Sequence, residues 1–349
     1  MGNEKSQKIV LFGDINLMGM HDPYIPFEKV KNCFDDADIK LANLECCFFD
    51  CDVVYNEINS KFRCEGLYAA TNMVEALKQL GISGVGTANN VNFGTDAVLS
   101  SVKCLDDNGI KHTGSGKNIM KAMKPIQLKS NGLRVGMVQK SCLYWPVNHE
   151  ARFQFPGISV LKVHTAYRPR IDERAVEKPG TPPEVITWCD PRYLDSFIEQ
   201  IKSMKGKNDI VIASIHWGLE DHVVSYQTDI AHALIDAGAD IIMGHGTHRA
   251  SGFEIYKKKS IFYSLGHFYF NIGHCATEPG NWVGLVPIIT IEKSEIVDIE
   301  IAFAMHTFDK KTEIVSVKQV EETFHEIEKI SASFNTFMEV SGDRVKLIF

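Results

Sequence analysis

Short apolar runs that stop abruptly at polar residues recur along the chain. The segments KIVLFGD, IKLANLE and GVGTANN end in Asp14, Glu45 and Asn90. Runs in which nearly every residue is apolar predict strands that are buried on both faces, as in parallel sheets. The abrupt ends therefore place polar side chains at one edge of a sheet.

Three later apolar runs carry histidines close to their ends. DIVIASIHWG contains His216, ADIIMGHGTH contains His245 and His248, and SIFYSLGH ends in His267. Together with the earlier runs, they give a series of expected strands that all finish in polar or titratable residues.

Helical apolar spacing appears between several of these runs. NMVEALKQLG, DAVLSSVKCLDDNG and DIAHALIDAG each stop at a glycine, at Gly81, Gly109 and Gly238. Glycine suits the left-handed residue that commonly closes a helix. Strand–helix alternation predicts an α/β fold with largely parallel pairing, in which ligands bind at the carboxyl ends of the strands. We therefore expect the polar strand ends to face one common site.

Two segments depart from this alternation. Residues 282–305, with polar alternation in EIVDIEI, predict a β-hairpin that extends a second, partly antiparallel sheet. Residues 167–183 are rich in proline and charge and predict a long loop. This loop carries three arginines, Arg168, Arg170 and Arg174. Their guanidinium groups suit an anionic substrate, and pairing with acidic residues of the same loop is the alternative.

Composition narrows the classes of function. The chain has 349 residues, 44% of them hydrophobic, and a formal net charge of −7. This acidity argues against general nucleic-acid binding. The chain lacks an apolar run of membrane-spanning length and a recognisable signal peptide, so we expect a cytoplasmic protein with no membrane span. The odd number of cysteines, 9, favours reduced thiols.

The polar strand ends have the chemistry of a metal site. Carboxylates, an amide and imidazoles bind Mn²⁺, Fe or Zn²⁺, and a bridging carboxylate can hold two such ions about 3.5–4 Å apart. We expect one or two divalent ions per chain. The candidate metal ligands are Asp14, Glu45, Asn90, His216, His245 and His248.

The wording and order of these motifs resemble a known family. GDINLMG, ANLE, GTANN, SIHWGLE, IIMGHGTHRASGFEIY and IFYSLGHFYFN look like the CapA/PgsA-type capsule and poly-γ-glutamate synthesis proteins. The resemblance implies a calcineurin-like metallophosphoesterase fold, a two-layer β-sandwich flanked by helices with a dinuclear metal site. It implies one domain over residues 8–349, with an insertion or lid over 141–190 and a C-terminal hairpin plus helix over 282–349.

The resemblance also implies roles for individual residues. Asp14 matches the first metal carboxylate, Glu45 the bridging acid and Asn90 the asparagine of the family's Asn-Asn-His motif. Asn16 stands where related phosphoesterases have a ligand histidine, which implies a weaker first metal. The remaining matches are to metal histidines, at His216, His245 and His248.

One departure from the family pattern bears on catalysis. The run Asn89-Asn90-Val91-Asn92-Phe93-Gly94 aligns best if the family's histidine and a following aspartate are missing. In related phosphoesterases that histidine protonates the leaving group or stabilises the charge of the transition state. His267 replaces an asparagine of the family, so we consider it as a catalytic substitute; a hydrogen bond to a loop is the alternative. The other candidate substitutes are His21, His222 and His274.

Two functions follow. The first is a metal-dependent enzyme that hydrolyses or transfers an amide, ester or phosphoester of an anionic, glutamyl- or aspartyl-like substrate, with Asn90 orienting the reacting oxygen. It would act in poly-γ-glutamate, capsule or natural-product biosynthesis. The second is a non-catalytic accessory or binding component that keeps the fold but has lost the catalytic histidine. Fold alone does not separate them.

Overall fold

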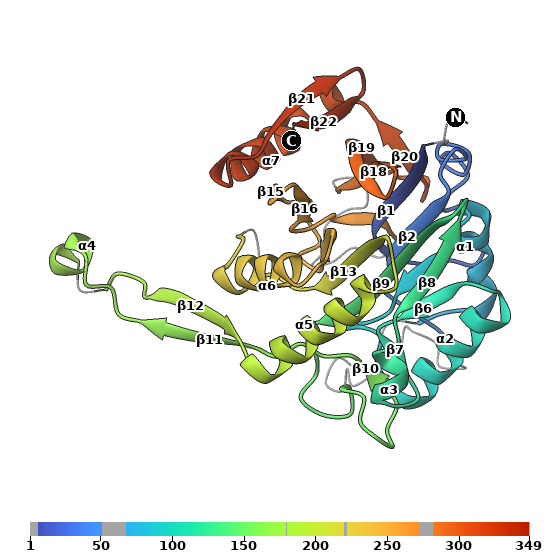
Figure 1. Cartoon of the computed structure of the whole chain (residues 1–349), viewed down its shortest axis with the longest axis horizontal. Coiled ribbons are helices and arrows are strands. Elements are labelled where there is room, and N and C mark those ends of the chain that lie inside the picture. Colours follow the sequence, from blue (N-terminus) through green and yellow to red (C-terminus); the bar gives the residue numbers. More distant parts are fainter. Residues whose placement is uncertain (1–5, 51–67, 179, 220–221, 272–281, 349) are drawn as a thin grey trace.

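The computed structural model describes residues 6–50, 68–178, 180–219, 222–271 and 282–348. Its larger sheet has the strand order β21-β22-β19-β18-β1-β2-β5-β6, with β17 also beside β1 and β20 beside β19 (Figure 1). The strands are β1 (Gln7–Asn16), β2 (Ile39–Leu44), β5 (Gly84–Gly86), β6 (Lys111–Thr113), β17 (His267–Phe270), β18 (Val283–Glu292), β19 (Glu295–His306), β20 (Thr312–Val315), β21 (Phe337–Ser341) and β22 (Arg344–Ile348).

The second sheet has six strands in the order β15-β16-β14-β13-β9-β8. They are β8 (Ile126–Ser130), β9 (Leu133–Ser141), β13 (Ile210–His216), β14 (Ile241–His245), β15 (Phe253–Tyr256) and β16 (Lys259–Phe262). Short pairs complete the strands of the described chain: β3 (Cys47–Phe48) with β4 (Tyr68–Ala69), β7 (Ser115–Gly116) with β10 (Gly157–Ile158), and β11 (Val163–Arg168) with β12 (Glu184–Cys189).

Helices lie outside the two sheets (Figure 1). They are α1 (Val74–Leu80), α2 (Thr95–Asp107), α3 (Ile119–Ala122), α4 (Glu173–Glu177), α5 (Pro191–Lys205), α6 (Ser225–Asp236) and α7 (Glu321–Ser333), with 3₁₀ turns at Thr71–Met73 and Val317–Val320. None of the helices in the described part of the chain is long and apolar enough to cross a bilayer.

The two sheets share one apolar core. Leu11 of β1 packs in the same buried cluster as Ile212 of β13 and Met243 of β14, so the sheets lie face to face. Side chains alternate along a strand, and Phe12 accordingly lies in a second cluster with Leu77 of α1 on the outer face. A third cluster joins the other sheet to α5 and α6. The apolar clusters thus hold the strand ends of both sheets against one another.

The expected α/β class is confirmed, but the pairing is mixed and not largely parallel, because strands β18 to β22 all pair antiparallel. β1 pairs in parallel with β2, β2 with β5, and β13 with both β9 and β14. The three helix-ending glycines have φ of 71° at Gly81, 73° at Gly109 and 112° at Gly238, the left-handed region predicted for them. The expected hairpin is β18–β19, but it joins the sheet of β1 because β18 pairs antiparallel with β1 itself.

Residues 163–189 form an arm instead of a plain loop. β11 and β12 pair along their whole length, and the short helix α4 lies between them. The arm projects away from the two sheets (Figure 1). The two strands, VHTAYR and EVITWC, are rich in the β-branched and aromatic residues that favour strands, and proline and most of the charge lie between them.

Candidate metal centre

Strand register brings the polar strand ends together. Asp14 on β1 is directly opposite His267 on the parallel strand β17, and His216 on β13 is opposite His245 on β14. In each of β2, β13 and β14, the side chains toward the shared core are apolar until the carboxyl end, where they become polar. This change leaves a polar, buried space between the ends of the two sheets.

One set of donor atoms joins Asp14, His248 and His267. One ligand atom from each lies within 4.8 Å of the others. Nδ1 of His248 is 2.5 Å from Nε2 of His267, and Nε2 of His248 is 3.9 Å from Oε1 of Glu45. Two imidazole nitrogens and two carboxylates therefore converge on this side of the space.

A second set joins Asp14, His216 and His245, again with donor atoms within 4.8 Å of one another. Nδ1 of His216 is 2.9 Å from Nδ1 of His245, which lies 3.7 Å from Oδ1 of Asp14. Asp14 thus occurs in both sets. The resemblance assigns the bridging position to Glu45, whereas the geometry places Asp14 between the two groups of histidines.

Asn90 contacts the second set through His216. Its Oδ1 lies 2.8 Å from Nε2 of His216, on the side of the ring opposite the nitrogen that faces His245. In this geometry the imidazole N–H donates to the amide, so Asn90 orients the ring. The role of Asn90 as a metal ligand stays a prediction.

Polar neighbours fix the orientation of the donor groups. The amide of Asn43 donates to Oδ1 of Asp14 at 2.7 Å and to Oε2 of Glu45 at 3.3 Å. Oγ of Ser214 lies 2.9 Å from Nε2 of His245. The amide nitrogen of Gln139 donates to the same Nε2 at 3.0 Å, so two side chains hold the ring of His245.

Burial determines the charge of this cluster. Asp14, Glu45, His216 and His245 are all 0% exposed. Burial raises the pKa of Asp14 to about 7, and burial together with the Asp14 charge raises the pKa of Glu45 well above its usual range. Burial lowers the pKa of His245 to about 3 and, with the neighbouring His245, the pKa of His216 well below its usual range.

The donor set suits a divalent cation. Among the described residues, Oδ2 of Asp14 and Oε1 of Glu45 are buried and accept no hydrogen bond. Buried oxygens without a partner are costly, and a nearby cation would supply the missing interaction. Carboxylate oxygens with neutral imidazole nitrogens are the mixture that Mn²⁺, Fe and Zn²⁺ accept. The residues present therefore fit the metal that the resemblance implies.

Asn16 takes no part in either donor set. Its Nδ2 donates to the carbonyl of Glu45 at 2.9 Å, and its Oδ1 accepts from the backbone N–H of Met18 at 2.9 Å. Both ends of the amide are therefore used by the backbone. His267, on the strand beside Asp14, supplies an imidazole on the same side of the space.

His248 has an unusual backbone. Its φ is 63°, in the left-handed region, where a residue other than glycine costs about 1–3 kcal/mol. The preceding Gly246 has φ 115°, and a Cβ there would lie 2.9 Å from the carbonyl of Trp217. The side chain of His248 is 25% exposed, whereas Glu45 is fully buried. The cluster therefore reaches the surface at His248.

The short Asn-rich turn is braced by His149, which the sequence does not single out. His149 is 1% exposed. Its Nδ1 accepts from the backbone N–H of Trp145 at 3.0 Å, and its Nε2 donates to the carbonyl of Asn92 at 3.1 Å. Burial lowers its pKa to about 4. Because both ring nitrogens are engaged by backbone groups, His149 supports the turn and is a poor proton donor.

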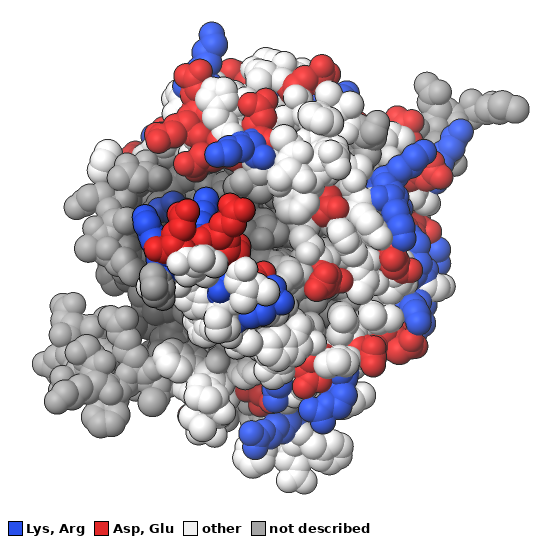
Figure 2. All heavy atoms as spheres, turned by 90° about the vertical axis from the view of Figure 1, so that its left-hand side faces the viewer, with Lys and Arg blue, Asp and Glu red and all other residues white. Residues whose placement is uncertain are grey.

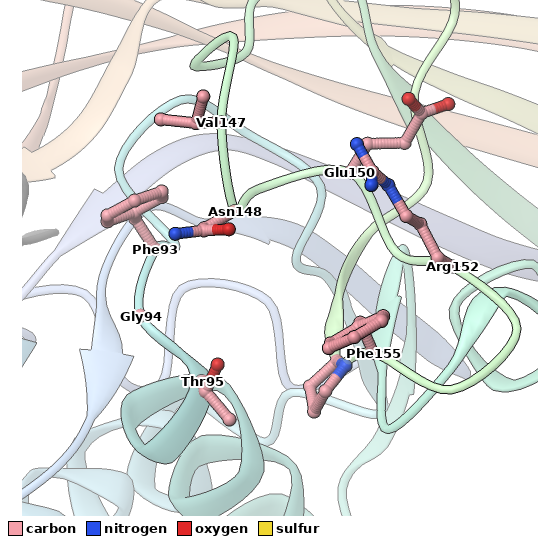
Figure 3. A pocket seen from close by; sticks show the side chains of 9 residues that line it. Phe93, Gly94, Thr95, Val147, Asn148, Glu150, Arg152 and Phe155 are labelled. Carbon is pink, nitrogen blue, oxygen red and sulfur yellow. The ribbon is translucent and has the colours of Figure 1, made fainter.

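A cavity of about 340 Å³ lies beside this turn. Figure 3 shows Phe93 and Asn148 on one side of it, Arg152 and Phe155 on the other, and Thr95 at the start of α2. The indole N–H of the nearby Trp145 donates to the carbonyl of Asn90 at 2.9 Å. Asn90 is thus held through its backbone by Trp145, while its side chain contacts His216.

The remaining candidates lie apart from the cluster. His21 and His222 are exposed and in neither donor set, and His274 lies outside the described residues. The three arginines are on the arm. Figure 2 looks along the arm from its tip and shows basic and acidic side chains intermixed there.

The described structure does not bring these arginines together with the donor cluster. Nη2 of Arg168 is 2.6 Å from Glu184, and Nη1 of Arg170 is 3.5 Å from Asp172. Arg174 lies in α4, whose residues are largely exposed. Substrate binding by these three residues stays a prediction, and two of them already have acidic partners within the arm.

Comparison with known proteins agrees with the motifs. A family model described as bacterial capsule synthesis protein PGA_cap matches residues 7–272. The capsule biosynthesis protein CapA of Bacillus anthracis is 30% identical over 217 residues, and the PGA biosynthesis protein CapA of Bacillus subtilis (strain 168) is 28% identical over 258 residues. An uncharacterised protein of Sinorhizobium fredii is 24% identical over 308 residues.

Each match covers only part of this chain and only part of the relative. They cover 61%, 72% and 75% of this chain, and 46%, 58% and 66% of the three relatives, in the order just given. The chain therefore spans about half to two thirds of the length of the curated relatives that it matches.

Proposed function

Because the chain belongs to the bacterial capsule synthesis protein family PGA_cap, we propose that it is a metal-dependent enzyme acting on an anionic substrate. The bond hydrolysed or transferred would be an amide, an ester or a phosphoester. We infer that the two packed sheets are the calcineurin-like metallophosphoesterase fold that the motifs imply. The observation that supports the proposal best is the pair of donor sets that share Asp14.

The two donor sets define the residues that would hold the metal. Asp14, His248 and His267 would hold one ion, with Glu45 beside them; Asp14, His216 and His245 would hold the other. A bound pair of such ions supplies an activated water and charge stabilisation for both the attacking and the leaving oxygen. These assignments make His267 a ligand, in the place that the resemblance leaves empty at Asn16.

The surrounding residues would position the substrate. His248 is the partly exposed member of the cluster, so the substrate approaches from its side. Asn90 holds His216 in place, and the amide of Asn43 holds both carboxylates. The cavity beside the short turn carries Arg152, whose guanidinium suits a carboxylate or a phosphate of the substrate.

A metal-binding but non-catalytic role is the second candidate. The observation that favours it is the turn at Asn89–Phe93, which carries no histidine and is closed by His149, with both ring nitrogens occupied. A missing general acid typically costs a factor of about 10²–10⁴ in rate. Such a protein would bind metal and an anionic polymer or precursor without turning it over.

Metal analysis of the full chain, purified without chelator, tests the proposal. We expect at least about one Mn, Fe or Zn per chain, and His216→Ala should lose most of the metal bound at its set. His306→Ala is the matched control, because His306 is similarly buried and, among the described residues, makes no ring-nitrogen hydrogen bond. Less than about 0.3 metal per chain, unchanged by added Mn²⁺ or Zn²⁺, would refute a metal centre.

Turnover separates the two candidates. The metal-loaded chain should hydrolyse or transfer at least one member of a panel of phosphoesters, γ-glutamyl amides and aspartyl or glutamyl esters, and His216→Ala should abolish that activity. Full metal content without turnover of any panel member would favour the accessory role.

A further inference from the structure

Lys140 is a buried lysine without an acidic partner. It follows Gln139 on β9 and, because side chains alternate along a strand, it faces α5 and not the metal centre. It is 3% exposed. Its Nζ lies 3.4 Å from Oγ of Ser159 and 5.1 Å from the centre of the Phe197 ring. Across the described chain, no carboxylate lies within ion-pair distance of this ammonium.

Lys140 lines a cavity of about 610 Å³ whose other charges are mostly basic. Lys162 and Arg192 also line it, and Glu150 is the acidic residue of the lining. Glu150 is already engaged, since it lies 3.2 Å from Nζ of Lys162 and accepts from the Tyr193 hydroxyl at 2.8 Å. Arg192 likewise has an acidic partner, since its Nη2 lies 3.2 Å from Asp190, so among the described lining residues Lys140 is the cation that has no carboxylate beside it.

An ammonium in this position favours an anionic occupant. Lysine has three N–H donors, and the only oxygen that the described residues bring to Nζ is the long contact to Ser159. Burying a charge without a partner is costly, and burial lowers the pKa of Lys140 to about 8. The walls also include apolar side chains such as Ile119 and Val160, which suit the organic part of a small molecule.

We propose that this cavity is a binding site for a small oxyanion, a carboxylate or a phosphate group, with Lys140 at its base and Lys162 and Arg192 at its rim. The site lies on the opposite face of β9 from the donor cluster. Anion binding at this site requires no metal, so an experiment can test it independently of the proposed metal centre.

Calorimetric titration of the full chain tests this site. Phosphate, acetate and succinate are titrated separately, with and without prior dialysis against a chelator, so that anions held by metal are recognised. We expect saturable binding of at least one of them with a Kd at or below about 1 mM, equal in both preparations. A response to phosphate alone identifies a phosphate ligand, and a response to acetate or succinate alone identifies a carboxylate.

Substitutions place the binding. Lys140→Met keeps the length of the side chain but removes its charge, and it should weaken anion binding at least tenfold. Lys129→Met is the matched control, because Lys129 is an exposed lysine on the neighbouring strand β8, and it should leave the Kd unchanged. Lys162 lines another wall of the cavity, so Lys162→Met should also weaken anion binding. This variant tests the proposal if Lys140→Met does not fold. Absence of saturable binding, or a Kd unaffected by both cavity variants, overturns the proposal.

Discussion

Replacing Ser214 by alanine removes one of the two side-chain hydrogen bonds to Nε2 of His245, the other being that of Gln139. Oγ of Ser214 lies 2.9 Å from Nε2 of His245, and both residues are buried. Loss of such a partner to a ligating histidine typically weakens metal affinity about 10–100-fold, which corresponds to about 1.4–2.7 kcal/mol. The folded chain itself should lose only about 0.5–1.5 kcal/mol, the net contribution of one hydrogen bond.

The assay is competition between the chain and a calibrated chelator for Zn²⁺ or Mn²⁺. Ser260→Ala is the control: Ser260 is 0% exposed in the same sheet, yet its hydroxyl has no partner among the described residues. We expect the Kd for metal to rise in Ser214→Ala and to stay unchanged in Ser260→Ala. An unchanged Kd in Ser214→Ala would show that Ser214 does not orient a metal-bound His245, and an equal rise in both variants would indicate a general effect of packing.

Two further substitutions test the other sites. His267→Asn removes an imidazole from the first donor set, so elemental analysis should show that metal content falls from about two ions to about one per chain. An unchanged metal content would mean that His267 has a hydrogen-bonding or catalytic role instead. If the arm contacts substrate, the triple alanine variant of Arg168, Arg170 and Arg174 should bind an anionic substrate at least tenfold more weakly, which is about 1.4 kcal/mol. An unchanged affinity in a binding titration would assign these residues to ion pairs within the arm.

The strand ends could be recognised from sequence because two local signals coincide there. An uninterrupted apolar run marks a strand with both faces buried, and the polar residue at its end has no apolar surface left to cover. Asp14, His216 and His245 follow this rule: parallel register pairs His216 with His245, and the packing of the two sheets brings Asp14 to them. The helix ends were predictable for a similar reason, since only glycine adopts the left-handed conformation of Gly81 without strain.

The residue that lies beside Asp14 could not be predicted from the sequence in the same way. His267 follows Asp14 by 253 positions in the numbering, and only the pairing of β17 with β1 places the two side by side. Sequence pattern identifies strands but leaves non-local pairing undetermined, so His267 stood as a candidate acid with no neighbour assigned. His149 carried no signal, because it lies in an irregular segment where neither period applies.

The burial of Lys140 could not be predicted from its own strand. A lysine inside a strand is normally interpreted as a residue on a solvent-exposed face, and in RVGMVQKS the alternation gives no warning that both faces are covered. The structure covers them because the two sheets meet on one side and α5 packs on the other. Burial of Lys140 is thus a consequence of layer arrangement, which the strand's own residues do not encode.

The position of β9 links the two proposed sites. Gln139 faces the cluster, where its amide lies 2.8 Å from Asn43 and 3.0 Å from Nε2 of His245, while the adjacent Lys140 faces the oxyanion cavity. A ligand that shifted the end of β9 would therefore change binding at both sites. Any such coupling must be reciprocal: an anion that changes the metal Kd by some factor requires the metal to change the anion Kd by the same factor. Equal anion affinities with and without chelator would accordingly mean that β9 is rigid and that the two sites, although back to back on one strand, bind independently.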